Sequence, residues 1–175
     1  MKKILLIFLM LSLVFCVFLA GAEDVEEAED TGYRPEDAIA YARIWGGSDR
    51  NPEYKDLSDI GDCANFVSQC LLAGGIETTE EWQPYTYAWK SARGLRGFLK
   101  TLGYKVQNRF TLDDIEPGDV IFGSDGVHVM IVVEKAEDRF YYCGHTSDRY
   151  WSESGNVKWL DYLIKMTPET EEDGQ

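Results

Sequence analysis

Residues 62–75 read Asp-Cys-Ala-Asn-Phe-Val-Ser-Gln-Cys-Leu-Leu-Ala-Gly-Gly, and this stretch decides the fold. Its apolar residues recur at helical spacing from Phe66 to Leu71, which predicts a helix that begins at Cys63 and stops at Gly74. A thiol at the start of a helix lies beside unsatisfied backbone N–H groups and the positive end of the helix dipole. Such surroundings favour the thiolate and lower the pKa of a thiol that has a histidine nearby. We therefore expect Cys63 to be the nucleophile of a cysteine hydrolase.

Helical patterns flank this stretch, and strand patterns follow it. A helix is expected from Pro35 to the glycine pair at 46–47, and another over residues 92–102. Residues 76–90 form an aromatic-rich connection. Strand patterns cover residues 120–122, 127–134, 140–145 and 157–164. Helices followed by an antiparallel meander predict an α+β domain, with N-terminal helices packed on an antiparallel sheet.

Both histidines of the chain fall within the strand patterns. His128 lies near the start of one strand, and His145 ends the next. A hairpin between these strands would bring the two histidines to neighbouring positions on one side of the sheet. We expect His128 to take the proton of the Cys63 thiol and return it to the leaving amine, and His145 to orient His128.

Four blocks of the sequence resemble one family. They are residues 62–70 with Ala73-Gly74-Gly75, residues 117–122 with 126–129, His145-Thr146-x-Asp148-Arg149, and Tyr33-x-x-x-x-Ala38 with Tyr41-Ala42. Together these blocks resemble the bacterial "putative amidase domain" family, which is grouped with the papain-like NlpC and CHAP cell-wall hydrolases. The resemblance covers residues 33–165 and implies a papain-like NlpC-type fold, hydrolysis of an amide bond, and cell-wall peptide as substrate. Met130 departs from the family pattern, where many relatives carry glycine.

Further residues are candidates for the site, each beside a structural alternative. The oxyanion hole is expected to use the Cys63 backbone N–H and a second donor, with Tyr54 or Asn65 as candidates. Asp62 is either part of the site or a helix N-cap. Asp148 either orients a histidine or caps a turn. The aromatic connection, with Trp82 and Trp89, either lines a substrate cleft or packs in the core.

The leading functional hypothesis is a secreted cysteine amidase or peptidase that uses neither a metal nor an organic cofactor. A transglutaminase-like acyl transferase built on Cys63, His128 and Asp148 is an alternative, as is a wall- or glycan-binding module whose site is no longer catalytic. A zinc site formed by Cys63, His128 and His145 is disfavoured because no pair of closely spaced ligands is present.

The ends of the chain predict its location and partners. Residues 1–22 read as a signal peptide, with Lys2 and Lys3 before an apolar run, so the mature protein is expected outside the cytoplasm without stable membrane association. Acidic, disordered segments are expected at 23–32 and 167–175 around a hydrolase domain at 33–166. The net charge is −14, and the absence of a basic stripe argues against nucleic-acid partners. A monomer acting on peptide or peptidoglycan stems is expected.

The cysteine count leaves one question open. The mature chain would hold Cys63, Cys70 and Cys143, an odd number, so at least one thiol has no partner within the chain. Cys63 and Cys70 are too far apart along one helix to form a disulfide. Either Cys70 pairs with Cys143, or all three remain reduced.

Overall fold

The computed structural model describes residues 32–123, 126–145 and 149–166, all within one compact unit, Thr31–Gln175. The predicted signal peptide, the acidic tail and all of the acidic linker except Gly32 lie outside these residues, as does Asp148. No helix in the described ranges combines the length and the apolar character needed to cross a membrane.

The helices precede most of the sheet in the chain, as predicted. They are α2 (Pro35–Trp45), α3 (Cys63–Ala73), α4 (Tyr87–Lys90) and α5 (Ala92–Thr101). Proline occupies the first turn of α2, where its missing N–H costs no hydrogen bond. The Ser91 hydroxyl accepts a hydrogen bond from the Gly94 N–H and caps α5. Only α4 was not predicted, because four residues are too few to show a helical period.

The sheet is antiparallel and has the strand order β1-β6-β2-β3-β4-β5. Its strands are β1 (Val106–Gln107), β2 (Val120–Gly123), β3 (His128–Ala136), β4 (Arg139–Gly144), β5 (Arg149–Ser154) and β6 (Leu160–Ile164). The predicted meander is correct for β2 to β4. It is wrong for the last predicted strand, because β6 crosses over to pair with β2 while the unpredicted β5 takes the place beside β4.

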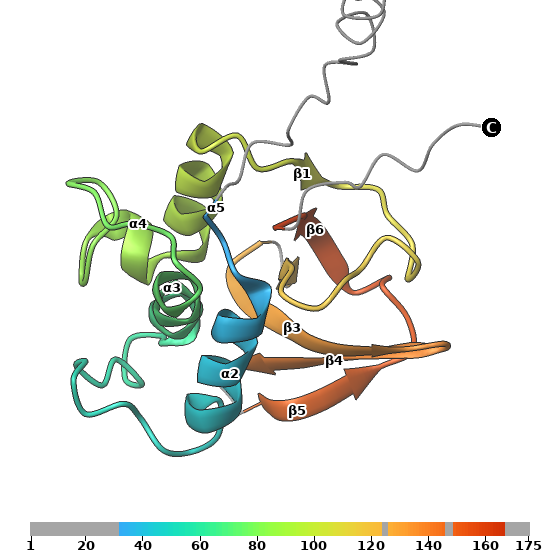
Figure 1. Cartoon of the computed structure of the whole chain (residues 1–175), viewed down its shortest axis with the longest axis horizontal. Helices are drawn as coiled ribbons and strands as arrows, with labels where there is room; N and C mark the ends of the chain where they lie inside the picture. Colours follow the sequence, from blue (N-terminus) through green and yellow to red (C-terminus); the bar gives the residue numbers. More distant parts are fainter. Residues whose placement is uncertain (1–31, 124–125, 146–148, 167–175) are drawn as a thin grey trace, which may run out of the picture. The chain divides into compact units, whose positions relative to one another are not determined.

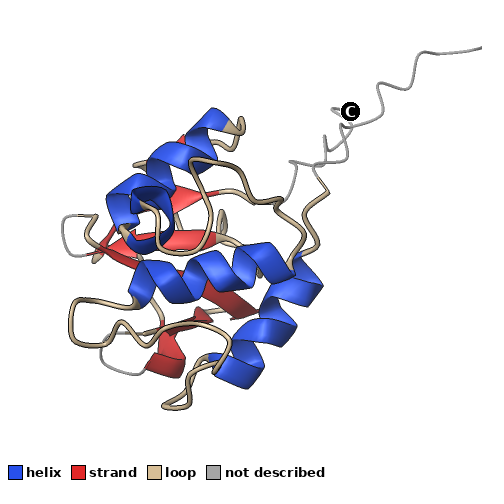
Figure 2. Ribbon diagram, turned by 90° about the vertical axis from the view of Figure 1, so that its left-hand side faces the viewer, coloured by secondary structure: helices blue, strands red, loops and turns tan. Residues whose placement is uncertain are grey.

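Helices cover one face of this sheet, and Figures 1 and 2 show them together on one side of the strands. Side chains of β3 alternate between two clusters, with Val129 and Ile131 facing the helices and Met130 and Val132 packing on the opposite face. Every residue of α3 from Cys63 to Leu71 is buried. The α+β class is therefore confirmed, with α3 as its central helix.

Two glycines allow the elements around α2 to approach closely. A Cβ atom at Gly74, which follows α3, would lie 2.6 Å from Cε2 of Tyr33. Gly118, in the turn before β2, has a φ of +95° and would place a Cβ atom 2.5 Å from Cβ of Pro35. The Tyr33 hydroxyl also donates a hydrogen bond to the Gly118 carbonyl. The start of α2 is thereby held against both the end of α3 and the entry into the sheet.

Candidate active site

Cys63 is the first residue of α3 and reaches the sheet through its sulfur atom. The thiol donates a hydrogen bond to the Val127 carbonyl, with Sγ 3.8 Å from the oxygen. Backbone hydrogen bonds from Val129, Ala64 and Cys63 itself also reach the sulfur. The side chain is 9% exposed, so the thiol lies at the boundary between the core and solvent.

His128 lies between Val127, whose carbonyl contacts this sulfur, and Val129 of β3, whose backbone also contacts it. It begins the strand, where it pairs with Gly123 of β2, and it is half-buried. The carbonyl of Val127 and the backbone of Val129 both contact Sγ, so the main chain on either side of His128 is held against the thiol.

The pKa of the Cys63 thiol differs from the expectation. Burial raises it above the ordinary value, and the backbone hydrogen bonds, led by that from Val129, lower it by a smaller amount. The predicted lowering of this pKa is therefore wrong, because the desolvation of a nearly buried sulfur outweighs the helix N-terminus. The resting group is a thiol, and it needs a base to become a nucleophile.

A pocket of about 290 Å³ opens at Cys63. Three large apolar residues that line it are mostly exposed: Ile60 is 75% exposed, Tyr87 63% and Val127 61%. Exposed apolar side chains that gather around a concave surface are typical of a binding site. Lys90 and Arg93 line the same pocket. The thiol therefore lies where a molecule with both apolar and anionic groups could bind.

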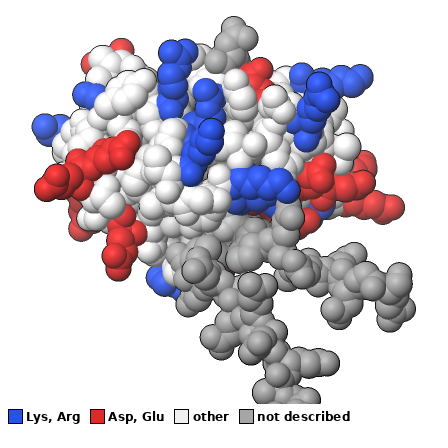
Figure 3. Space-filling view, turned by 90° about the horizontal axis from the view of Figure 1, so that it is seen from above, with Lys and Arg blue, Asp and Glu red and all other residues white. Residues whose placement is uncertain are grey.

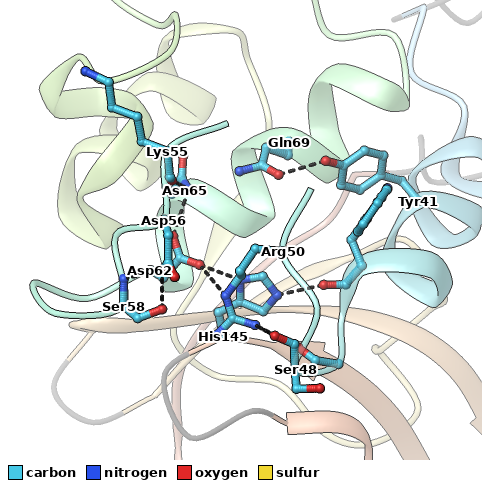
Figure 4. A network of polar contacts seen from close by, with 12 residues as sticks. Tyr41, Ser48, Arg50, Lys55, Asp56, Ser58, Asp62, Asn65, Gln69 and His145 are labelled. Atoms are coloured by element: carbon cyan, nitrogen blue, oxygen red, sulfur yellow. Dashed lines mark hydrogen bonds and ion pairs between the residues drawn. The ribbon is translucent and has the colours of Figure 1, made fainter. Parts of the chain in front are cut away.

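His145 is buried against α3, where its ring stacks on Phe66 with the centroids 4.1 Å apart. Its Nδ1 lies 2.6 Å from Oδ2 of Asp62, and its Nε2 lies 2.7 Å from the carbonyl oxygen of Trp45 (Figure 4). The predicted orienting contact with His128 is therefore wrong, since both ring nitrogens have other partners. The register of β3 and β4 also separates the two histidines. Ile131 pairs with Cys143, so continuing this register places His145 opposite Val129 and not opposite His128.

The partners of His145 also indicate its charge. A backbone carbonyl and a carboxylate both accept hydrogen bonds, so Nε2 and Nδ1 must both donate if Asp62 is ionised. Arg50 supports the ionised form, because its Nε lies 3.2 Å from the same Oδ2 atom. With an ionised Asp62, these contacts are those of an imidazolium ring paired with a carboxylate, and both side chains are buried, at 2% and 1% exposed.

Asp62 therefore organises a polar network at the start of α3. It occupies the N-cap position, but its side chain makes no capping hydrogen bond to the helix. Its Oδ1 instead accepts a hydrogen bond from Nδ2 of Asn65 at 2.7 Å, while Oδ2 faces His145 and Arg50. Figure 4 shows these side chains converging from α3, from the loop before it and from the end of β4.

Other predicted site residues have structural partners. Asn65 is not an oxyanion donor, because both of its amide hydrogens are used, toward Asp62 and the Lys55 carbonyl, while its Oδ1 accepts from Nε1 of Trp89 at 2.7 Å. Trp82 and Trp89 are fully buried and belong to the core rather than to a cleft. Tyr54 stacks on Trp89 and is not among the described residues that line the Cys63 pocket.

Sequence reasoning missed several contributors to this region. Arg50 lies in a polar loop and carries no local signal of its pairing with Asp62. Lys90 and Arg93 could have been noticed as candidate binding residues, because they are two bases three residues apart around the start of α5. The cysteine question is resolved, since Cys63, Cys70 and Cys143 are all free thiols. Within the described ranges, no group of three His, Cys, Asp or Glu side chains is arranged to hold a metal ion.

Comparison with known proteins identifies relatives of this chain. The sequence model of the family described as "Putative amidase domain" matches residues 32–167. Two proteins of Bacillus subtilis (strain 168), both described as uncharacterized, are similar: YjcM is 34% identical over 132 residues and YhbB is 34% identical over 137 residues. The alignments cover 67% of this chain and 32% of YjcM, and 66% of this chain and 43% of YhbB, so the chain spans less than half of either relative. No solved structure matches. Because the family match covers well over half of the sequence, this chain belongs to the putative amidase domain family.

Proposed function

We propose that this protein hydrolyses an amide bond with Cys63 as nucleophile and His128 as general base. One observation carries the proposal: the Cys63 sulfur contacts the backbone on both sides of His128 and faces an open pocket. A buried thiol with a raised pKa needs a base, and the contact of the sulfur with both chain neighbours of His128 supports this half-buried histidine as that base. Membership of the amidase family supports an amide substrate.

The reaction follows from this arrangement. As the sulfur attacks the carbonyl carbon, His128 takes the thiol proton, so no free thiolate has to accumulate in a site that disfavours it. Negative charge develops on the carbonyl oxygen near the start of α3, where the Cys63 N–H can donate to it. His128 then gives the proton to the leaving amine, and a thioester forms between Cys63 and the acyl group. Water, deprotonated by His128, hydrolyses the thioester and regenerates the thiol.

Asp62 and His145 act as positioning residues in this proposal. Asp62 directly precedes the nucleophile, and its contacts with His145 and Arg50 fix the backbone at that point. His145 in turn connects α3 to the end of α2 through the Trp45 carbonyl. Neither residue touches the reacting atoms, and together they hold the first turn of α3 in place.

The finer assignments rest on resemblance and on the N-terminal sequence. A cysteine at the start of a helix, followed in the chain by an antiparallel sheet with a histidine at a strand start, resembles the papain-like NlpC arrangement. The apolar run after Lys2 and Lys3 supports export. For an exported member of an amidase family, cell-wall peptide is the proposed substrate.

Alkylation kinetics test the nucleophile and base pair. The rate of Cys63 modification by iodoacetamide is measured against pH by mass spectrometry, in the native chain and in His128→Ala. Cys70 and Cys143 are fully buried and serve as internal controls that should not react in the folded protein. We expect the native chain to react at neutral pH and the variant to react only at more alkaline pH. An unreactive Cys63, or the same profile in both proteins, would instead support the binding module.

Product analysis separates hydrolysis from acyl transfer. The native chain is incubated with peptidoglycan stem peptides, with and without a simple primary amine, and the products are identified by mass spectrometry. Free acid in both samples supports the amidase. An amide of the added amine would support the transglutaminase-like alternative, and the Cys63→Ala variant controls for contaminating activity.

A further inference from the structure

One part of this acidic protein has the opposite charge. Residues 82–112 contain six bases, namely Lys90, Arg93, Arg96, Lys100, Lys105 and Arg109, and no Asp or Glu. The whole chain carries a net charge of −14. The net charge of the whole chain hides this basic segment. The expectation that the protein has no basic stripe is therefore wrong.

The structure folds part of this segment into a groove of about 720 Å³ along α5. Four of its bases line the groove together with two tyrosines, Tyr104 and Tyr162, and none of the described lining residues is acidic. Figure 3 shows Lys and Arg side chains gathered across this side of the molecule. A concave surface lined by cations concentrates anions from solution.

Arg96 is the most constrained of these cations. Its guanidinium lies over the ring of Tyr162, 3.9 Å from the centroid, and 5.8 Å from that of Phe122. Its Nη1 is buried and has no hydrogen-bond partner among the residues that the structure describes. This nitrogen would also lie 2.6 Å from a Cβ atom at Gly126, so the glycine makes room for it. A guanidinium held by aromatic rings with an unused donor is prepared to bind an oxygen acceptor.

The groove and the pocket at the thiol share one lining residue. Arg93 lines both cavities, and Lys90 lines the Cys63 pocket. Arg93, Arg96 and Lys100 follow one another at intervals of three and four residues, which places them along one face of α5. The seven residue steps from Arg93 to Lys100 rise roughly 10 Å along the helix, about the length of three residues of extended peptide.

We propose that this cationic groove binds the carboxylates of a peptide substrate whose amide bond lies at Cys63. This inference rests on the proposed function and names its substrate class as an acidic peptide. This arrangement favours a peptide over other polyanions as the ligand, because the carboxylates and the amide bond to be cleaved then belong to one short chain. Arg93 binds the carboxylate nearest the thiol, and Arg96 and Lys100 bind those farther along.

Calorimetric titration of the full chain carrying Cys63→Ala tests the groove without turnover. The ligands are a blocked hexapeptide of alternating Ala and Glu and the same peptide with Gln in place of Glu. Loss of two charge-assisted hydrogen bonds predicts that the Gln peptide binds at least about tenfold more weakly. Affinity for the Glu peptide should fall as salt is raised, because exposed charges are screened.

Matched variants locate the effect. Arg93→Gln/Lys100→Gln removes two exposed cations from the groove, and Arg43→Gln/Lys158→Gln removes two exposed cations from elsewhere. The first pair should weaken binding of the Glu peptide about tenfold, while the second should leave it unchanged. Circular dichroism confirms that each variant is folded, and Arg96→Gln is added if its spectrum matches the native one.

Three results would overturn the inference. They are equal affinity for the Glu and Gln peptides, equal effects of the two variant pairs, and displacement of the Glu peptide by inorganic phosphate at equal carboxylate and phosphate concentrations. The last would describe a general anion site instead of a peptide site. Because binding is measured without Cys63, a failed binding test is distinguishable from a failed alkylation test of the proposed function.

Discussion

Replacing Asp62 by Asn tests the buried ion pair at the start of helix α3. In the native chain the carboxylate has hydrogen bonds with His145 and Asn65 and forms an ion pair with Arg50. An Asn side chain of the same shape keeps an oxygen for Asn65 and offers an NH₂ group where Oδ2 lay. His145 must then release its Nδ1 proton so that this nitrogen can accept a hydrogen bond, and Arg50 loses its anion.

The cost can be worked out from these contacts. Removing one partner of a buried pair costs about 3–5 kcal/mol when the other charge is left uncompensated. In Asp62→Asn the imidazole can become neutral, which leaves only the Arg50 contact unmade, at about 1–3 kcal/mol. We therefore expect Asp62→Asn to lose about 1–3 kcal/mol of unfolding free energy and Asp62→Ala about 3–5 kcal/mol. Asp37→Asn, which removes an exposed ion pair with Arg34, should lose no more than about 1 kcal/mol.

Two measurements check this reasoning. Urea unfolding followed by tryptophan fluorescence gives the free energies, and ¹⁵N NMR of the imidazole rings reports which nitrogens carry protons. Only two histidines occur in the chain, so the His145 signals can be assigned with one variant, His128→Ala. Protons should be seen on both His145 nitrogens in the native chain and on one in Asp62→Asn. A singly protonated His145 in the native chain, or equal losses in Asp62→Asn and Asp37→Asn, would refute the buried ion pair.

Three further outcomes are expected. Burial raises the pKa of the Cys70 thiol and of the Tyr33 hydroxyl, so the folded chain retains these protons to higher pH than the unfolded chain does. The unfolding free energy should therefore be highest below the ordinary thiol pKa of about 8.5 and should decline as the pH rises above it. Urea midpoints that stay constant up to about pH 10.5 would contradict this. Trp89→Phe leaves the buried Asn65 Oδ1 without its donor and should lose about 1–3 kcal/mol in the same assay, whereas a loss near zero would mean that water replaces the indole. Gly118→Ala should lower the melting temperature, because Gly118 has a positive φ and a Cβ atom there would collide with Pro35. Gly97→Ala should raise the melting temperature slightly, because Gly97 lies inside α5 with open space around it. Equal shifts in the two variants would show that the close approach at Gly118 does not affect stability.

The sequence predicted local structure better than it predicted pairing. Helix α3 could be foreseen because its apolar residues recur at helical spacing and two glycines follow its end. The crossover of β6 to β2 could not, because strand order depends on contacts between segments far apart in the chain. The same limit applies to the site, where the role of His145 is set by Asp62, 83 residues earlier.

The candidate nucleophile could be recognised in the sequence, whereas the basic groove was overlooked there. Cys63 was identified because its type, its helix and its position agree in one short stretch. The direction of its pKa change was missed because burial, a tertiary property, outweighs the helix terminus. The groove along α5 was present in the sequence as a run of bases without acids, and it was overlooked because charge was summed over longer segments.

The burial of α3 has a consequence for how such a protein can diversify. Cys63 is attached to a helix packed on all sides, so substitutions near it in the chain disturb the core and are removed by selection for stability. The exposed residues around the pocket, Ile60, Tyr87 and Val127, lie on other segments and contribute little to that core. Under the proposed function, the reaction chemistry at Cys63 and the preference for a substrate are therefore subject to separate constraints. Descendants of one ancestor can acquire new substrates by exchanging this rim while the helix beneath stays the same.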